Sequence, residues 1–208
     1  DHCPKPVVAA LNGLALGGGL ELAIRCQALV ACDSAWMQLP EVTLGIVPGI
    51  GAMVAPYRRW PRAAATFNRM LTRAEKLTAA EAHDIGMITT LVQQPAELIP
   101  AAVAQVRALS GAIHKIPDEP VAVAAFEESD NMSAAGDILS RQTIAIIEKA
   151  VTAAAAAPSF AAALEVGYQA FGDSACTAPA RGGISALQER RQPLFQFVQP
   201  AGTHHHGL

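Results

Sequence analysis

The sequence predicts an α/β fold with a helical C-terminal portion, and three observations lead to this prediction. The apolar run at residues 7–11 has the length and β-branched start of a fully buried parallel strand. Strand-like and helix-like segments alternate early in the chain, and alanine-rich, helix-like segments dominate late. The chain has 208 residues, of which 51% are hydrophobic, so it can form one sizeable core and a single domain is the default.

A glycine-rich turn follows the first predicted strand. Asn12-Gly13 is a turn signal, and the chain then passes through Gly17, Gly18 and Gly19. Apolar residues recur at helical spacing after the glycines, so a helix is expected to begin there. Further strands are expected at residues 28–31, 35–39 and 87–92, and helices at residues 52–60, 61–71 and 95–109.

Capping residues and prolines set the limits of the later helices. Thr78 and Glu81 form a capping box at the start of a short helix. After residue 109 the chain is predicted to be mainly helical, and its alanine run at residues 153–157 indicates a helix face packed closely on a neighbour. Breaks are expected around residues 117–120, at residue 158 and around residues 172–179.

Composition and charge exclude several classes of function. The formal net charge of -3 gives no electrostatic reason to expect nucleic acid or an anionic membrane as a partner. No apolar run reaches the roughly 18 residues that span a bilayer, and nothing suggests secretion. The 4 cysteines lack CxxC spacing, which favours a reduced, cytoplasmic location. No metal site is predicted, because zinc spacing is absent outside His204–His206, which we interpret as a flexible tail.

Two common glycine motifs do not fit the turn. A phosphate-binding loop needs Lys followed by Ser or Thr after its last glycine, and Leu20-Glu21 stands there instead. A dinucleotide fingerprint that starts at Gly17 needs Gly or Ala in the place of Leu22. What remains is a strand-to-helix turn whose first backbone N–H groups have no partner within the helix. Such a turn can stabilise an oxyanion, with each donor contributing on the order of 3 kcal/mol.

Two acidic residues follow this turn, and their spacing alone leaves two interpretations open. Glu21 lies in the first helical turn, where it either works beside an oxyanion site or is an ordinary N-terminal helix charge. In the second case the glycines only permit tight packing of the helix on the strand. Glu41 follows Pro40 in an irregular loop, and an acid in such a place is usually just solvated.

Four blocks of sequence resemble the crotonase (enoyl-CoA hydratase/isomerase) superfamily. The first two, KPVVAALNGLALGGGLELA from Lys5 and LPEVTLGIVPGIG from Leu39, are highly specific. The third combines LTR at residues 71–73 with AAEAHDIGMITTLV from Ala79, and the fourth is GISALQERRQPLF from Gly183. Together they touch most of the chain. The resemblance implies a crotonase-like ββα spiral core, incomplete at its N-terminus, with a helical C-terminal portion.

The resemblance also implies an activity and its residues. The backbone N–H of Gly18 would donate to the thioester oxygen of an acyl-CoA, and Glu21 and Glu41 would be the acid and base carboxylates. Because both glutamates are present, the leading hypothesis is hydration of a 2-enoyl-CoA to a 3-hydroxyacyl-CoA, in the degradation of fatty, aromatic or alicyclic acids. The alternatives are isomerisation or hydrolysis of an acyl-CoA, or a non-catalytic subunit of this fold. Residues expected to contact the substrate are Gly17, Gly19, Pro40 and Gly49.

Partners and cofactors follow from the same resemblance. Coenzyme A is expected only as part of the acyl-CoA substrate, with no separate cofactor. A homo-oligomer is expected, a trimer or a hexamer, and the chain is also compatible with being part of a larger polypeptide.

The sequence departs from the family pattern in three places. The family's other oxyanion donor lies in an earlier block of Ser-Ala-Gly-x-Asp type, which is absent, so we expect poor activity from this chain alone. Ala52 stands where glycine is common, and residues 112–157 are longer than usual. We therefore divide the chain into the C-terminal half of the spiral core (1–111), a helical region with an extra stretch (112–199) and a flexible tail (200–208).

Several further residues have two interpretations. Tyr57 to Trp60, at the end of a predicted helix, either contact an acyl chain or CoA phosphates or are normal capping charges, which we favour. A contact of Arg190 and Arg191 with the phosphates stays open. Cys26 and Cys32 are expected to be buried small hydrophobes, and His83 and His114 to lie on the surface.

Overall fold

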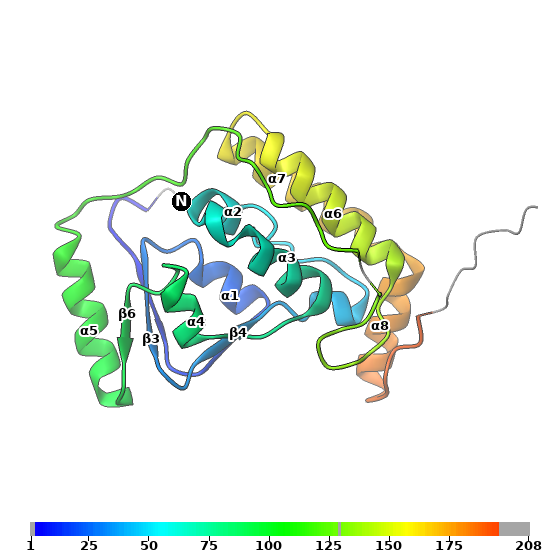
Figure 1. Ribbon diagram of the computed structural model, residues 1–208, viewed down its shortest axis with the longest axis horizontal. Helices are drawn as coiled ribbons and strands as arrows, with labels where there is room; N and C mark the ends of the chain where they lie inside the picture. Colours follow the sequence, from blue (N-terminus) through cyan, green and yellow to red (C-terminus); the bar gives the residue numbers. More distant parts are fainter. Residues whose placement is uncertain (1–2, 129, 196–208) are drawn as a thin grey trace, which may run out of the picture.

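Two small sheets organise the first part of the computed structural model, which describes residues 3–128 and 130–195. One sheet is parallel and has the order β1-β3-β6, and the other has the order β2-β4-β5 with an antiparallel β5 (Figure 1). The α/β fold class is therefore confirmed. The strands are β1 (Val8–Leu11), β2 (Leu14–Leu16), β3 (Ala28–Cys32), β4 (Trp36–Gln38), β5 (Leu77–Thr78) and β6 (Thr90–Val92).

The first predicted strand is present but is less buried than expected. β1 pairs parallel with β3, as predicted. It lies at the end of its sheet, however, and Ala10 is exposed, so the prediction of a fully buried strand is wrong. β3 has a strand on each side and is buried at every residue. Burial on both faces is therefore reached only where a parallel strand is central.

Helices cover the sheets and form the opposite end of the molecule. α5 packs on β1 and β3, and α6 and α7 form a hairpin far from α5 (Figure 1). The helices that precede β6 in the chain are α1 (Gly18–Ala23), η1 (Glu41–Leu44), α2 (Ala55–Arg59), η2 (Pro61–Ala63), α3 (Ala64–Arg73) and α4 (Ala79–Asp84). The later helices are α5 (Pro95–Ala108), α6 (Arg141–Ala156), α7 (Phe160–Ala175) and α8 (Ala178–Gln188).

Hydroxyl side chains cap the helices at the positions where they begin. The Thr78–Glu81 capping box at the start of α4 is confirmed. Ser140, Ser159 and Thr177 each accept a hydrogen bond from a first-turn backbone N–H of α6, α7 and α8. Each bond satisfies a helix-end donor that has no partner within the helix. The expected breaks at Pro158 and around residues 172–179 are both confirmed, since α7 begins at Phe160 and ends at Ala175, and α8 begins at Ala178.

The prediction of a mainly helical chain after residue 109 is wrong for residues 112–128 and 130–140, where the structure goes well beyond the expected break at residues 117–120. Residues 112–128 and 130–140 contain no helix and form a strap that crosses from α5 to α6 (Figure 1), with a turn closed by one isolated bridge between Met132 and Ile138. Several of its carbonyls accept hydrogen bonds from side chains of other segments, as Ala124 does from Asn68. The alanine run that follows is helical through Ala156, and Ala154 and Ala155 are buried, as the packing prediction requires.

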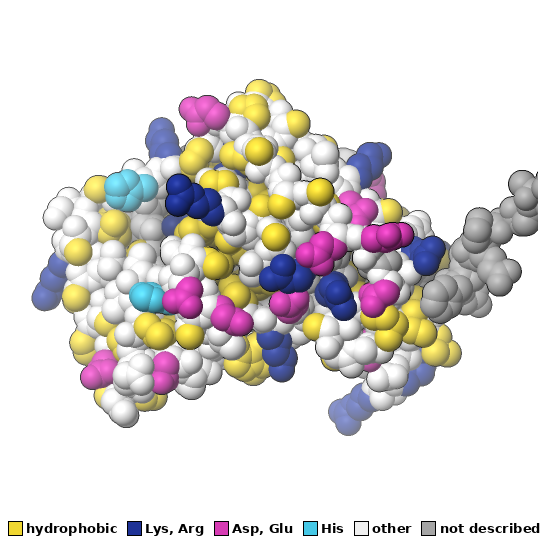
Figure 2. Space-filling model, in the orientation of Figure 1, with side chains coloured by type: hydrophobic (Ala, Val, Ile, Leu, Met, Phe, Trp, Pro, Cys, Tyr) yellow, Lys and Arg dark blue, Asp and Glu magenta, His cyan; other side chains and the backbone are white. Residues whose placement is uncertain are grey.

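The surface in Figure 2 shows acidic and basic side chains interspersed on one face, without a field of single sign. Among the described residues, no helix is both long enough and apolar enough to cross a membrane. The main hydrophobic core lies between the sheets and the helices and contains Leu29, Met37, Tyr57 and Ile147.

Candidate active site

The glycine turn joins β2 to α1 and leaves donors exposed to a ligand. Gly17 has a positive φ of 49°, and its N–H donates to the carbonyl of Gln38 over 3.0 Å. α1 then begins at Gly18, and no described side chain caps its first turn. The N–H groups of Gly18 and Gly19 therefore have no partner within the helix and point out of its N-terminus.

Glu21 is buried and is held by a loop that is distant in sequence. Its side chain is 2% exposed. Oε1 accepts a hydrogen bond from the N–H of Ile50 over 2.8 Å and from the N–H of Ala52 over 2.9 Å. Glu21 is therefore not an ordinary solvated helix charge. Arg25 reaches the same loop, because its Nη1 donates to the Ile50 carbonyl over 2.6 Å.

Glu41 approaches the turn from the second block. A Cβ atom on Gly17 would lie 2.7 Å from Glu41 Oε1, so the carboxylate rests against a position that only glycine leaves open. Oε2 is buried and has no hydrogen-bond partner in the described part of the chain. The pKa of Glu41 is raised to about 7, mainly because the carboxyl is buried; a hydrogen bond from Glu41's own backbone lowers the pKa, and the nearby carboxyl of Glu21 raises it by a smaller amount. Glu41 is therefore not a solvated loop acid.

The structure brings most of the predicted site residues together. Pro40 precedes Glu41, and its Cδ lies 3.9 Å from the Cβ position of Gly17. Nothing lies within 4 Å of the Cβ position of Gly19, so the turn is open there. Gly49 lies in the loop that follows Glu41 but faces α7, where the ring of Phe171 would lie 2.9 Å from an added Cβ.

Sequence reasoning missed three residues of this site. Ile50 and Ala52 supply the donors to Glu21 through their backbones, which leave no signal in side-chain type. Ile50 also lies beside the turn, since its Cδ1 would be 3.4 Å from a Cβ on Gly18. Phe171 comes from α7, more than a hundred residues later in the chain, so no spacing rule connects it with Gly49.

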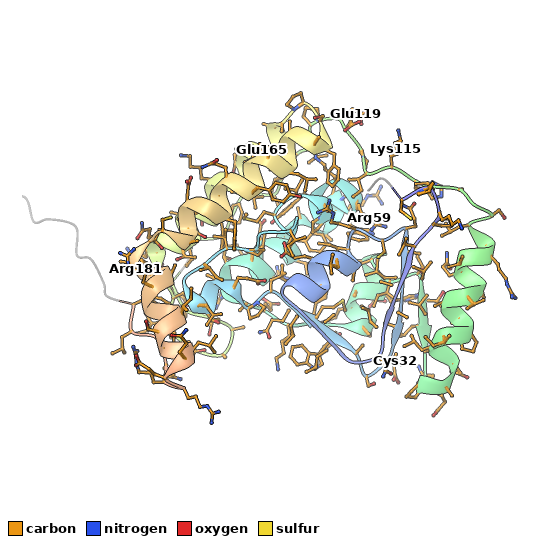
Figure 3. All side chains as sticks on the ribbon, turned by 180° about the vertical axis from the view of Figure 1, so that it is seen from behind. Cys32, Arg59, Lys115, Glu119, Glu165 and Arg181 are labelled. Atoms are coloured by element: carbon orange, nitrogen blue, oxygen red, sulfur yellow. The ribbon has the colours of Figure 1, made fainter. Side chains whose placement is uncertain are left out.

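The basic residues after the second block hold the fold together. Arg58 is 3% exposed and donates to the carbonyls of Pro117, Glu119, Ala154 and Ala157. Arg59 lies between α2 and the chain that follows α1 (Figure 3), and donates to the carbonyls of Ile24, Cys26 and Gln27. These arginines cap carbonyls of other segments, so neither the CoA-phosphate contact nor the capping of their own helix is supported.

The remaining cysteines, histidines and arginines singled out in the sequence lie away from the two carboxylates or on the surface. Cys32 is buried as predicted, whereas Cys26 is half-buried. His83 and His114 are exposed, as predicted. Arg190 and Arg191 are exposed as well. Within residues 3–128 and 130–195, no three His, Cys, Asp or Glu side chains are grouped so that they could hold a metal ion. The His204–His206 tail lies outside the described residues.

The larger hollows lie away from the carboxylates. One cavity of about 410 Å³ lies between α6, α8 and residues 194–195, and another of about 410 Å³ lies between α6 and α7. Neither Glu21 nor Glu41 lines them. These two cavities therefore do not contain the candidate site.

Known proteins are similar to this chain over most of its length. The family model for enoyl-CoA hydratase/isomerase matches residues 1–128. A putative enoyl-CoA hydratase/isomerase of Bacillus subtilis (strain 168) is 32% identical over 198 residues, which cover 95% of this chain and 64% of that protein. A crotonyl-CoA hydratase of Syntrophomonas wolfei is 32% identical over 194 residues, covering 92% and 62%.

Solved structures show the same likeness. Carnitinyl-CoA hydratase from Mycobacterium avium has a TM-score of 0.63 and 25% identity, covering 93% of this chain and 63% of that one. A further relative, matched by sequence alone, is a peroxisomal fatty acid beta-oxidation multifunctional protein of Arabidopsis thaliana. It is 47% identical over 90 residues, which are 42% of this chain and only 12% of that protein. This chain thus spans less than two thirds of the length of these relatives.

Proposed function

Because this chain belongs to the enoyl-CoA hydratase/isomerase family, we propose that it acts in the hydration of a 2-enoyl-CoA to a 3-hydroxyacyl-CoA. The observation that carries this proposal is the pair of carboxylates beside the glycine turn. Glu21 receives two backbone hydrogen bonds, whereas Glu41 has a buried oxygen without a partner. Carboxyl groups in such different environments can divide the roles of acid and base.

The proposed reaction uses each group once. The thioester oxygen accepts a hydrogen bond from the Gly18 N–H, which offsets the negative charge that builds up on this oxygen during addition. Glu21 uses the oxygen not held by Ile50 and Ala52 to take a proton from water, and the hydroxide oxygen bonds to the β-carbon. Glu41, with its pKa of about 7, holds a proton near neutral pH and gives it to the α-carbon.

The exposed apolar residues beside the glycine turn indicate that full activity needs a further segment of chain. Leu14 and Leu22 flank the turn and are 63% and 62% exposed, although both are large and apolar. β1 and β2 are at the ends of their sheets. Since the relatives are longer than this chain, we propose that a further segment covers this side and supplies a second donor to the thioester oxygen.

The remaining properties are proposed from family membership. We propose an acyl-CoA thioester as the partner, with no separate cofactor, a trimeric or hexameric homo-oligomer, a cytoplasmic location, and the division at residues 111 and 199.

The test compares Glu21→Gln and Glu41→Gln in hydration of crotonyl-CoA. Each change removes one proton-transfer group and is expected to lower kcat by about 100-fold or more. Glu128→Gln, on the exposed strap, is the matched control and should leave kcat unchanged. Loss of hydration in only one of the two site variants would show that the two-carboxylate mechanism is wrong.

A further inference from the structure

The loop of residues 45–52 determines the positions of both carboxylates. It follows directly after η1, which begins with Glu41. Its far end carries the N–H groups of Ile50 and Ala52, which donate to Glu21. A displacement of this loop would therefore remove the donors from Glu21 and move Glu41 away from the turn.

Two hydroxyl groups from the C-terminal helices bind the first three residues of this loop. Ser174, in the last turn of α7, accepts a hydrogen bond from the N–H of Val47 over 3.3 Å and donates to the Phe171 carbonyl over 2.9 Å. Thr143, in the first turn of α6, donates to the carbonyl of Gly45 over 3.1 Å. Both side chains are buried, at 0% and 1% exposed. Their bonds satisfy one donor and one acceptor of the loop backbone.

Close packing limits the loop on the same side. A Cβ on Gly45 would lie 2.5 Å from the carbonyl oxygen of Pro179, and one on Gly183 would clash with the Leu44 carbonyl. The Phe171 ring presses on Gly49 in the same way. The C-terminal helices therefore contact the loop at Gly45 and at Gly49. The hydrogen bond between Ser174 and Val47 lies between these two contacts.

Ser174 places a buried hydroxyl in the last turn of an otherwise alanine-rich helix. Helix α7 is rich in alanine, which is the best helix former and has no polar atom to bury. A buried hydroxyl is costly unless it is hydrogen-bonded, and without it the N–H of Val47 would have no partner. A hydroxyl in the last turn of α7 is thus explained by its bond to the loop.

We propose that Ser174 is a positioning residue that holds residues 45–52 where their N–H groups reach Glu21 and where Glu41 meets the glycine turn. The importance of this position for catalysis rests on the proposed function. The positioning itself does not, because it can be measured on the carboxylate donors without any substrate.

The experiment measures amide hydrogen exchange by NMR in the full 208-residue chain and in its Ser174→Ala variant. The exchange rates at Ile50 and Ala52 are divided by those of the buried strand β3, which report global opening. In Ser174→Ala this ratio should rise about tenfold, because the loop has lost a buried hydrogen bond. An unchanged ratio would overturn the proposal.

The matched control is Ser159→Ala at the other end of the same helix. It also removes one hydroxyl and one hydrogen bond, the cap to Ala162, and should lower stability while leaving the ratio unchanged. If Ser174→Ala does not fold, Ser174→Cys replaces it, since sulfur keeps the volume but accepts hydrogen bonds weakly. A several-fold rise in the ratio is then expected, and no rise contradicts the proposal.

Kinetics separate this inference from the proposed function. With crotonyl-CoA, Ser174→Ala should lower kcat several-fold and leave KM nearly unchanged, because the variant misplaces the carboxylates and not the thioester site. If a form of the protein that also carries the covering segment does not hydrate crotonyl-CoA, the proposed function fails, and the exchange ratio still decides whether Ser174 positions the loop.

Discussion

Gly17 allows the glycine turn and the loop that carries Glu41 to lie in contact. Its positive φ is a conformation that side chains rarely adopt, and its missing Cβ is the space that Glu41 Oε1 occupies. The same residue accepts the first helical hydrogen bond from the Glu21 N–H over 2.9 Å. A single glycine thus turns the chain and starts α1. It also admits a carboxylate from another loop.

Gly17→Ala is therefore expected to damage the site more than the fold. The new methyl group would displace the Glu41 carboxylate into solvent, and the pKa of Glu41 would fall from about 7 towards its ordinary value. Backbone strain should lower the free energy of unfolding by about 1 kcal/mol or more. Carboxyl ¹³C NMR titration measures the pKa. Gly13→Ala, where a Cβ meets nothing within 4 Å, is the control and should leave the Glu41 titration in place.

The same pKa predicts a pH dependence of stability. Glu41 ionises near 4.5 when unfolded and near 7 when folded, so the folded protein binds its proton more tightly. The stabilisation is fully present below pH 4.5 and is lost as the pH rises through 7. Glu41→Gln cannot titrate. Its free energy of unfolding relative to wild type should therefore rise by about 3 kcal/mol between pH 4 and pH 8. Urea unfolding measures this, and equal pH profiles for the two proteins would contradict it.

Sequence reasoning could name these residues but not their surroundings. Glu21 and Glu41 were identified through the resemblance to a family, while spacing alone left each with a simple alternative. The burial of Glu21 depends on N–H groups about thirty residues away in the chain. The unpartnered Oε2 of Glu41 depends on packing, which no local pattern encodes.

At the scale of elements, the strap of residues 112–140 shows why local composition fails. Its alanines favour helix, but prolines at 117 and 120 interrupt the pattern. The guanidinium of Arg58 then binds the carbonyls of Pro117 and Glu119, which a helix would have paired internally. The start of α4 was easier to predict, because Thr78 and Glu81 of its capping box lie within one segment.

Arg58→Met should therefore loosen the strap and the end of α6 together. The change removes the guanidinium donor from four carbonyls, two of them in buried hydrogen bonds, and the free energy of unfolding should fall by about 2–4 kcal/mol. Limited proteolysis should cut within residues 112–128 before it cuts elsewhere. Arg62→Met is a matched control on the exposed surface and should change stability by less than about 0.5 kcal/mol. Equal losses in both variants would rule out the anchoring role of Arg58.

At the scale of the whole molecule, the surface beside the glycine turn combines exposed apolar side chains with unpaired strand edges. Parallel sheets are normally covered on both faces, and unpaired strand edges invite association with other chains. Here β1 and β2 are both end strands, and exposed Leu14 and Leu16 lie on β2 itself. This surface is adjacent to the N–H groups of Gly18 and Gly19, so whatever covers it also closes the candidate active site.

The uncovered edge predicts concentration-dependent self-association of the 208-residue chain. Leu14→Lys places a charge on the edge strand and should shift sedimentation towards the monomer, because edge charges oppose strand pairing. Ile99→Lys on α5 is an equally exposed control, at 64% against 63% for Leu14, but it lies on a helix and should not alter association. If both changes act equally, general apolar exposure drives the association. If the edge drives it, only Leu14→Lys acts, and the surface beside the glycine turn is where this fold needs a further strand.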